Sequence, residues 1–296
     1  MIKVFIWGMG SIYNKMRNVL NYYEMKKEML IVGITAKEIP HFKYVDGIEI
    51  LSYENIKSVN FDYIIVMSDV YFKEIFDEIV KIGISTNQIL KYNFLEIPYL
   101  NVSEYLDIKK RKITIFSNNC WAGMLYKTLG LECLSPTKNL FIREDDYLRF
   151  LENPKFYLKS EVIFKRWEID SNSQKKYPVL MCKDIEIHCN HKDEIGDAIV
   201  EWKRRCVKVN YDCMYAEMYT ENVETANKFK QIKGYKGKIC FVPWKTEEQD
   251  LIYLKKLPGQ KHFWETVNNS IAVCSNGYQV DVISIFNENK VYRFQE

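Results

Sequence analysis

The first 119 residues of this 296-residue chain contain no cysteine, although eight cysteines follow them. None of the eight forms a Cys-x-x-Cys pair, which argues against a zinc knuckle. Several lie inside apolar strand patterns, among them Cys182, Cys213 and Cys240. We therefore expect reduced, buried thiols in a cytoplasmic protein rather than disulfides.

Long hydrophobic runs and a large charge of one sign are also missing. No apolar run approaches the roughly 20 residues of a membrane span, and no basic segment followed by a long apolar one marks a signal peptide. The net charge is only +3, whereas binding to a phosphate backbone needs a strongly basic surface. The one dense basic run, residues 109–112, falls between two patterned regions and is interpreted as a solvated linker.

The first hundred residues alternate apolar strand patterns with amphipathic helix patterns. Strands are predicted at 2–7, 29–34 and 61–67, and helices at 11–23 and 70–82, the second ending at Gly83. Alternation of this kind predicts a parallel sheet covered by helices.

The second half repeats this plan with different spacing. Strands are predicted at 112–116, 179–187, 212–219 and 238–242, and helices at 121–129, 145–153, 193–209 and 223–232. Residues 280–286 and 290–294, joined by a short turn, predict a C-terminal antiparallel hairpin. The expected fold class is therefore α/β: two doubly wound, Rossmann-like three-layer units with mostly parallel sheets, at residues 1–108 and 109–296.

The turn after the first strand begins like a dinucleotide-binding fingerprint, with Gly8 and Gly10. Tyr13 replaces the third glycine, which allows close packing of helix on strand, and Thr35 stands where NAD-binding domains carry an acid for the ribose. These departures disfavour NAD-dependent redox chemistry. The backbone at Gly8, Gly10 and Ser11 still suits a phosphate, so these three are the candidate cofactor-binding residues, with the cofactor itself left open.

Cys120 lies at a second strand-to-helix junction, in the sequence Ser117-Asn118-Asn119-Cys120-Trp121. The first N–H groups of a helix lack partners and favour an anion or a thiolate. Cys120 is therefore a candidate nucleophile with a lowered thiol pKa, and the other four are candidate substrate-binding residues. The alternative is that Cys120 is a small residue packed under the helix, capped by the two asparagines.

A catalytic cysteine also needs a base, and His188 and His191 follow the predicted strand 179–187 at its carboxyl end, where open α/β sheets bind ligands. Asp184, Glu186 and His188 alternate along one face, in a pattern that suits acid–base catalysis or a divalent cation. A solvent-facing strand edge is the alternative. We assign Asp184 and His188 to catalysis and His191 to substrate binding, and we assign no residue to a metal.

Two further charged features have two interpretations each. Arg204 and Arg205 lie on the predicted helix 193–209, where they either reach a phosphate or belong to a solvated face. Glu217 lies in an otherwise apolar strand between Tyr215 and Tyr219. It needs a partner if it is buried, or it lines the same sheet edge as the histidines.

The N-terminal part resembles a Rossmann-like domain of surface-polysaccharide enzymes, some of which are sugar acetyltransferases of the sialic-acid and bacillosamine type. The residues that carry the resemblance are 6–10 (IWGMG), 45–51 (VDGIEIL) and 61–66 (FDYIIV). The resemblance implies that Gly8 and Gly10 face a nucleotide-sugar. The acid that the family carries after the second strand is missing here.

The second half resembles a bacterial family of exopolysaccharide-biosynthesis proteins with a domain of unknown function. The matching motifs lie at residues 117–123 (SNNCWAG), 129–131, 135–137, 150–154 and 184–188 (DIEIH). The likeness runs over residues 112–244 and implies a pathway but no mechanism. Ala122 is a departure, since relatives carry a glycine there.

We therefore expect a cytoplasmic transferase, glycosyl or acyl, that acts on an activated sugar or a related anionic substrate in surface-polysaccharide synthesis. The alternative is a non-catalytic module that binds a nucleotide-sugar or serves as a scaffold. The expected partner is a small molecule, without nucleic acid or a membrane span. An aromatic content of 15% leaves a homo-oligomer open.

Overall fold

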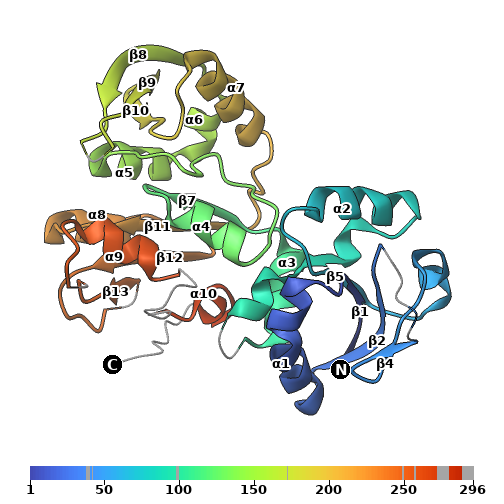
Figure 1. The fold of residues 1–296 in the computed structure, drawn as a ribbon. Coiled ribbons are helices and arrows are strands. Elements are labelled where there is room, and N and C mark those ends of the chain that lie inside the picture. Colours follow the sequence, from blue (N-terminus) through green and yellow to red (C-terminus); the bar gives the residue numbers. More distant parts are fainter. Residues whose placement is uncertain are drawn as a thin grey trace. The chain divides into compact units, whose positions relative to one another are not determined.

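The computed structural model describes residues 1–37, 41, 43–97, 100–171, 173–248, 250–256, 258–271 and 280–288. The chain divides into two compact units, residues 1–106 and 107–296 (Figure 1). Each unit contains a parallel sheet with helices, so the expected α/β class with mostly parallel sheets is confirmed. No helix among these described residues is long and apolar enough to cross a membrane.

The sheet of unit 1 has the strand order β2-β1-β5-β6, and all neighbouring strands are parallel. Its strands are β1 (Ile2–Trp7), β2 (Met29–Thr35), β5 (Tyr63–Val66) and β6 (Ile89–Lys91). Its helices are α1 (Ser11–Met25) and α2 (Phe72–Lys81), with the 3-10 helices η1 (Tyr53–Ser58), η2 (Thr86–Gln88) and η3 (Tyr92–Glu96) and the small hairpin β3 (Tyr44–Val45) and β4 (Ile48–Glu49).

Both faces of this sheet are buried, as is usual for parallel strands. Phe5 and Trp7 of β1 pack in one apolar cluster with Ile79 of α2. Val4 and Ile6 are equally buried and point to the opposite face, because successive side chains of a strand alternate. The near-continuous apolar sequence of β1 therefore follows from its central place in the sheet.

The strand order of unit 1 reverses at β1, since β2 lies on one side of it and β5 on the other. Open α/β sheets bind ligands in the crevice outside the carboxyl ends of the strands at such a reversal. Gly8 and Met67 directly follow β1 and β5, so the glycine turn lies at this point of the sheet.

The parallel sheet of unit 2 has the order β13-β12-β11-β7. Its strands are β7 (Thr114–Ser117), β11 (Met214–Tyr219), β12 (Gly237–Val242) and β13 (Leu251–Tyr253). They follow chain order in one direction. The second doubly wound sheet that we expected is therefore replaced, within the same α/β class, by a sheet without a reversal.

Helices cover both faces of this sheet (Figure 1). Helices α5 (Glu144–Glu152) and α8 (Val223–Gln231) pack in one apolar cluster with Phe116 and Ala216. On the other face, Trp121 of α4 (Trp121–Thr128) lies against Phe241, and Phe263 of α9 (Phe263–Asn269) lies against Tyr219, with ring centroids 5.5 and 6.2 Å apart.

An antiparallel sheet of order β10-β9-β8 is inserted between α5 and β11. It consists of β8 (Val162–Ile169), β9 (Lys176–Cys182) and β10 (Ile185–His188), preceded by α6 (Pro154–Lys159) and followed by α7 (Ile195–Cys206). The single strand expected at 179–187 is therefore wrong. The chain reverses after Cys182 in a two-residue turn, in which Lys183 adopts a positive φ of 57°.

The expected C-terminal hairpin is also wrong in its first strand, because residues 282–288 form α10 (Val282–Glu288). Asp281 Oδ1 accepts hydrogen bonds from the N–H groups of Ile283 and Ser284, at 3.0 and 3.2 Å. A carboxylate in this position favours a helix start over a strand. The expected second strand, 290–294, lies outside the described residues.

The basic run 109–112 is part of a structured element rather than a solvated linker. Residues through Arg111 belong to α3 (Val102–Arg111). Burial lowers the pKa of Lys109, and Arg111 donates hydrogen bonds to the carbonyl oxygen of Phe286 (2.8 Å) and to the hydroxyl of Tyr215 (3.1 Å). Lysine and arginine favour the last turn of a helix because they complement its dipole.

Candidate functional site

The junction between β7 and α4 is fixed to the neighbouring strand β11 at the carboxyl edge of the sheet. Ser117 pairs in register with Glu217. Asn118 bridges to the backbone of Tyr219: its Nδ2 donates to the carbonyl oxygen (3.4 Å), and its Oδ1 accepts from the N–H group (3.3 Å). The residues expected to form a site therefore stand at the carboxyl ends of β7 and β11.

Glu217 lies under this junction and is fully buried. Its Oε2 makes a short hydrogen bond with Ser117 Oγ, and its Oε1 accepts from Asn119 Nδ2 at 3.0 Å. Burial raises the pKa of Glu217 to about 8, although the bonds to Ser117 and Asn119 oppose this shift. The carboxyl group is therefore neutral at pH 7.

Asn119 connects this buried acid to the start of α4. Its Oδ1 accepts the N–H group of Trp121 at 2.6 Å and thereby satisfies a free donor of the first helical turn. Cys120 lies between these two residues, so its position follows from the hydrogen bonds on either side of it.

Cys120 and His191 form a thiol–imidazole pair, with Sγ 3.3 Å from Nε2. The thiol is half-buried and the imidazole is exposed, so a solute can reach the pair. Contact between a thiol and an imidazole is the arrangement in which histidine acts as the base for a cysteine nucleophile. The imidazole in contact with Cys120 is thus that of His191, which we had assigned to substrate binding, rather than that of His188.

The lowered thiol pKa that we expected for Cys120 is wrong. Burial and the nearby Glu217 raise the pKa of the Cys120 thiol to about 11. The free-energy cost of removing a thiolate from water exceeds the stabilisation that the N-terminus of a short helix provides. Cys120 therefore carries its proton at neutral pH.

The structure encloses four of the five expected substrate-binding residues, and only His191 is exposed. Ser117 is fully buried, and its N–H group donates to Thr137 Oγ1 at 2.9 Å. Trp121 is equally buried, and its Nε1 donates to Ser270 Oγ at 3.2 Å. Asn118 and Asn119 are 1% and 5% exposed. These four residues shape the junction from beneath, and Cys120 and His191 are the members that solvent reaches.

The structure does not bring Asp184 to Cys120. Asp184 lies in the turn before β10, where it accepts from the hydroxyl of Tyr157 (3.0 Å) and pairs with Arg149 Nε (3.3 Å). His188 closes the same strand at its other end, about 13 Å away at 3.3 Å per residue. The two expected acid–base residues therefore belong to different places.

His188 is instead buried beneath a half-exposed charged cluster on the antiparallel sheet. Its Nδ1 lies 3.2 Å from Glu168 and its Nε2 lies 3.6 Å from Glu186. Burial lowers the pKa of His188, against the attraction of Glu168. Hydrogen bonds from Arg166 hold the pKa of Glu186 at about 2. Arg166 thus pairs with both carboxylates of the cluster. No group of three or more His, Cys, Asp or Glu that could hold a metal ion occurs among the described residues.

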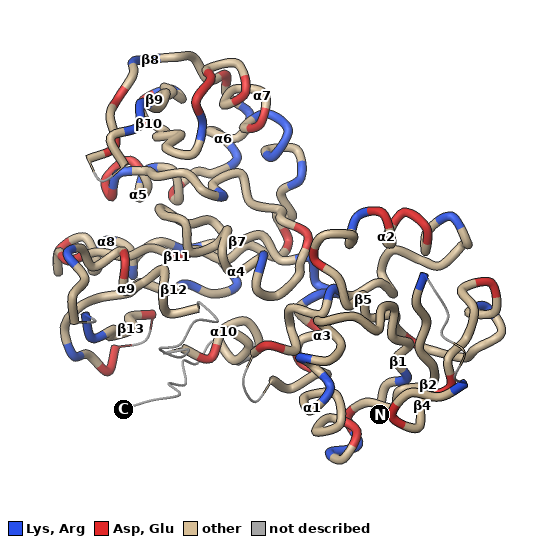
Figure 2. Tube along the Cα trace, viewed as in Figure 1, with Lys and Arg blue, Asp and Glu red and all other residues tan. Residues whose placement is uncertain are grey.

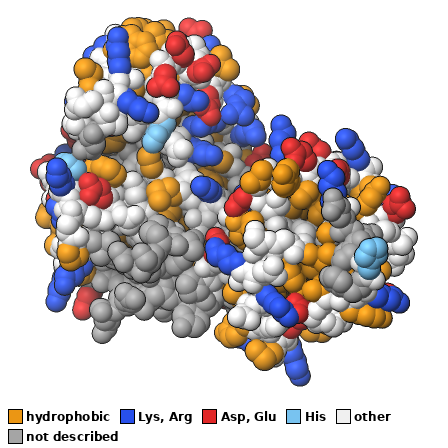
Figure 3. Space-filling view, in the orientation of Figure 1, with side chains coloured by type: hydrophobic (Ala, Val, Ile, Leu, Met, Phe, Trp, Pro, Cys, Tyr) orange, Lys and Arg blue, Asp and Glu red, His pale blue; other side chains and the backbone are white. Residues whose placement is uncertain are grey.

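Arg204 and Arg205 of α7 were expected either to reach a phosphate or to belong to a solvated face, and the structure gives them different surroundings. Lys203, Arg204 and Arg205 lie in its last turn, and Figure 2 marks basic residues in blue along α7. Lys and Arg side chains gather on this part of the surface of unit 2 in Figure 3. Arg204 is exposed, as on a solvated face. Arg205 donates to the carbonyl oxygen of Lys138 at 2.6 Å and pairs with Glu201, so its role is structural.

The two glycines of the turn after β1 differ in their roles: the backbone conformation requires Gly8, whereas Gly10 leaves free space beside the turn. Gly8 has a φ of +115°, and a side chain there would touch Met67 at 3.4 Å. A Cβ atom at Gly10 would meet nothing within 4 Å. Ser11 begins α1 and is exposed. Gly10 and Ser11 therefore border open space at the strand reversal, whereas Gly8 lies against Met67.

Two neighbouring residues explain how unit 1 departs from a dinucleotide fingerprint. Tyr13 is buried against the sheet, and its hydroxyl donates to Asp46 Oδ2 at 2.9 Å. Thr35 is fully buried, its carbonyl oxygen accepts the N–H group of Gly8 at 2.8 Å, and its Oγ1 has no hydrogen-bond partner among the described residues. The position that would hold a ribose is thus occupied by a buried hydroxyl.

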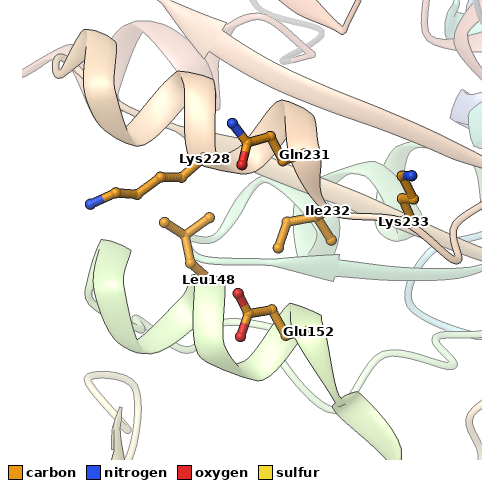
Figure 4. Close-up of a pocket in the computed structure, with 6 residues that line it drawn as sticks. All are labelled: Leu148, Glu152, Lys228, Gln231, Ile232 and Lys233. Carbon is orange, nitrogen blue, oxygen red and sulfur yellow. The ribbon is translucent and has the colours of Figure 1, made fainter.

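A separate pocket of about 460 Å³ opens between α5 and α8 (Figure 4). Leu148 and Ile232 form its apolar floor, and Glu152, Lys228, Gln231 and Lys233 line its rim. Lys228 pairs with Glu224 at 2.9 Å. The pocket involves none of the residues of the β7–α4 junction.

Glu217 is the residue whose importance the sequence signalled only weakly. A charged residue inside an apolar strand indicates a buried group that needs partners, but the pattern does not say which partners. They are provided by Ser117 and Asn119, about a hundred residues earlier in the chain. Thr137 adds support from a third segment.

Comparisons with known proteins match two family models to successive parts of the chain, with a boundary at residues 90 and 91, inside unit 1. Residues 91–287, more than half of the chain, match the family model described as "Domain of unknown function (DUF1919)". Residues 1–90 match a model described as "C2185-like, N-terminal". The chain is also similar to an "Uncharacterized protein" of Haemophilus influenzae, with 27% identity over 146 residues, which are 48% of this chain and 68% of that relative.

Proposed function

This chain belongs to the family described as a domain of unknown function (DUF1919), so we infer its chemistry from its site. We propose that it is a transferase acting on an activated sugar or a related anionic substrate. The observation that carries the proposal is the contact of Cys120 Sγ with His191 Nε2 at 3.3 Å. The pair stands at a helix N-terminus on the carboxyl edge of a parallel sheet.

A thiol–imidazole pair supports acyl transfer more directly than glycosyl transfer, because a sulfur nucleophile forms a thioester with an acyl donor. In the first step the Cys120 proton moves to His191 while sulfur bonds to the acyl carbon, and the leaving group departs with that proton. In the second step an acceptor hydroxyl gives its proton to His191 and bonds to the acyl carbon, and Cys120 regains its thiol.

The raised pKa of Cys120 decides the timing of the first proton transfer. A thiol with a pKa of about 11 does not rest as a thiolate at neutral pH, so the proton must move to His191 as sulfur attacks. N–H groups at the start of α4 favour the negative charge that then develops on the acyl oxygen.

The sugar part of the proposal rests on unit 1 and on the resemblance to polysaccharide proteins. Gly10 borders open space beyond β1, and N–H groups at the start of the 15-residue helix α1 favour a phosphate. A role in surface-polysaccharide synthesis in the cytoplasm is the setting that the resemblance supports.

Two measurements test this proposal. A thermal-shift panel of nucleotides and nucleotide-sugars should contain a member that stabilises the chain, by about 2 kcal/mol at thirty times its dissociation constant. Incubation with acetyl-coenzyme A or p-nitrophenyl acetate should add one acyl group to the peptide that contains Cys120, detected by mass spectrometry.

Matched variants separate the outcomes. Cys120→Ser should lose the adduct, and His191→Gln should slow its formation by about 10²-fold or more, as expected for removal of a general base. A ligand that binds tightly and is recovered unchanged, with no adduct, would favour the non-catalytic module. The absence of both ligand stabilisation and an acyl adduct would refute the transferase proposal.

A further inference from the structure

Glu217 is a buried titratable group that the proposed chemistry does not use. No ion pair of Glu217 with a basic residue occurs within the described part of the chain. The titratable groups that act on or with it are Tyr147 on α5, Cys120 before α4, Cys240 on β12 and Tyr219 on β11. An ionised Glu217 would therefore be a buried charge without a counter-ion, which is costly.

The Ser117 hydroxyl is free to donate to Asn119 only when Glu217 is neutral. Ser117 has one hydroxyl proton, and three acceptors lie within reach of it: Glu217 Oε2, the carbonyl oxygen of Asn119 at 3.1 Å and Asn119 Oδ1 at 3.2 Å. A neutral Glu217 donates its own proton to Ser117 Oγ, so Ser117 can donate to Asn119. An ionised Glu217 takes the Ser117 proton for itself and leaves the Asn119 carbonyl without this donor.

The protonation state of Glu217 affects Cys120 through the side chain of Asn119. Asn119 Nδ2 donates to Glu217 Oε1 (3.0 Å), and Asn119 Oδ1 accepts the N–H group of Trp121 (2.6 Å). The residue between them is Cys120. A rearrangement of Asn119 therefore moves the backbone that aims the thiol at His191.

We propose that Glu217 is a positioning residue for Cys120: as a neutral acid it holds residues 117–121 in place, and when it ionises it loosens them and opposes thiolate formation, so that the site functions only while Glu217 is protonated. This inference rests on the proposed function in taking Cys120 as the reacting group. It adds an upper pH limit that is set by a group which never touches the substrate.

The test compares wild type with Glu217→Gln in the full chain. Glutamine keeps both hydrogen bonds, since its Nε2 donates to Ser117 Oγ and its Oε1 accepts from Asn119, but it does not titrate. The rate of Cys120 alkylation by iodoacetamide is followed from about pH 6 to 10 by peptide mass spectrometry. The variant should ionise Cys120 at lower pH, with three- to tenfold faster labelling near pH 9, a tenfold change for each unit of pKa.

Glu224→Gln is the matched control, because Glu224 is an exposed glutamate of α8 whose side chain is 77% accessible. It should leave the Cys120 profile unchanged. Identical profiles in wild type and Glu217→Gln would overturn the inference. A purely structural Glu217 would instead speed the labelling of the buried Cys182 and Cys240 along with Cys120, and this outcome also refutes it.

A second measurement uses only the wild-type protein, so the test does not depend on the folding of Glu217→Gln. Infrared spectroscopy should detect a protonated carboxyl group that persists to neutral pH and disappears near pH 8, and hydrogen exchange of residues 117–122 should rise over the same interval. A missing carboxylic band at pH 7 would refute the inference. Neither measurement uses a substrate, so failure of the transferase proposal is seen separately, in the acyl-adduct experiment.

Discussion

Two opposing effects set the acidity of Cys120. A helix N-terminus favours a thiolate by roughly 0.3–1 kcal/mol at an exposed site, which is less than one pKa unit at about 1.4 kcal/mol per unit. Burial and Glu217 act in the other direction and bring the pKa to about 11. Burial prevails because α4 is short and the thiol lies half inside the protein.

The consequence for labelling can be measured. Cys120 should react with iodoacetamide before Cys182 and Cys240, because it is half-exposed while those two are fully buried. Its rate should nevertheless rise with pH through a midpoint above the roughly 8.5 of a free thiol. Peptide mass spectrometry after timed labelling gives both quantities.

Cys120→Ser is the control for peptide assignment. A midpoint below that of a free thiol would show that His191 or the helix outweighs burial. Labelling no faster than that of Cys240 would show that the thiol is closed to solvent, and the chemistry would then have to be assigned to other residues.

At the scale of elements, the pairing of β1 with β2 depends on a glycine. Gly33 pairs with Phe5 just after a shift in register. A Cβ atom at Gly33 would lie 2.7 Å from Phe5 Cε2 and 3.2 Å from Leu51 Cδ1. The ring of Phe5 is fully buried, so it has little room to move away.

Gly33→Ala should therefore destabilise unit 1 by about 1–3 kcal/mol, the usual cost of overpacking a core. Gly196→Ala is the matched change, because Gly196 lies on α7 and a Cβ atom there meets nothing within 4 Å. It should be neutral or stabilise by up to about 1 kcal/mol through helix propensity. Urea denaturation of the two variants compares them, and equal effects would contradict this description of the β1–β2 contact.

At the scale of the whole molecule, Glu217 links proton binding to the stability of the fold. An acid whose pKa rises from 4.5 in the unfolded chain to about 8 in the folded one binds its proton more tightly when folded. Its contribution is favourable at low pH and is lost as pH rises from about 5 to 8. Over that interval it changes the free energy of unfolding by about −1.4 kcal/mol per pH unit.

Glu217→Gln should remove this slope. The free energy of unfolding from urea titrations at several pH values between about 5 and 8 should fall less steeply for the variant than for wild type. His188 acts in the opposite direction, since its lowered pKa causes stability to be lost as pH falls below about 6.5. Parallel slopes for the two proteins would show that Glu217 is already ionised in the folded state.

The sequence by itself determined the α/β class and most of the elements. Apolar runs bounded by glycine and polar turns located β1, β2, β5, β11 and β12, and amphipathic spacing located α1, α4, α5, α7 and α8. These signals are local, since a buried strand or a helix face needs a particular side chain every second or every third to fourth residue. The junction at 117–121 was visible for the same reason.

Only the tertiary structure decided the partners. The pairing of Glu217 with Ser117 and Asn119 depends on contacts between residues far apart in the chain. The same holds for the choice of His191 over His188 as the neighbour of Cys120, because the hairpin turns His188 into a separate cluster with Glu168 and Glu186. The hairpin at Lys183 and the helix α10 depend on a turn conformation and a capping carboxylate, which the apolar pattern does not contain. A thiol's acidity and a carboxyl group's proton are set by burial and by such neighbours, and periodicity along a sequence contains neither.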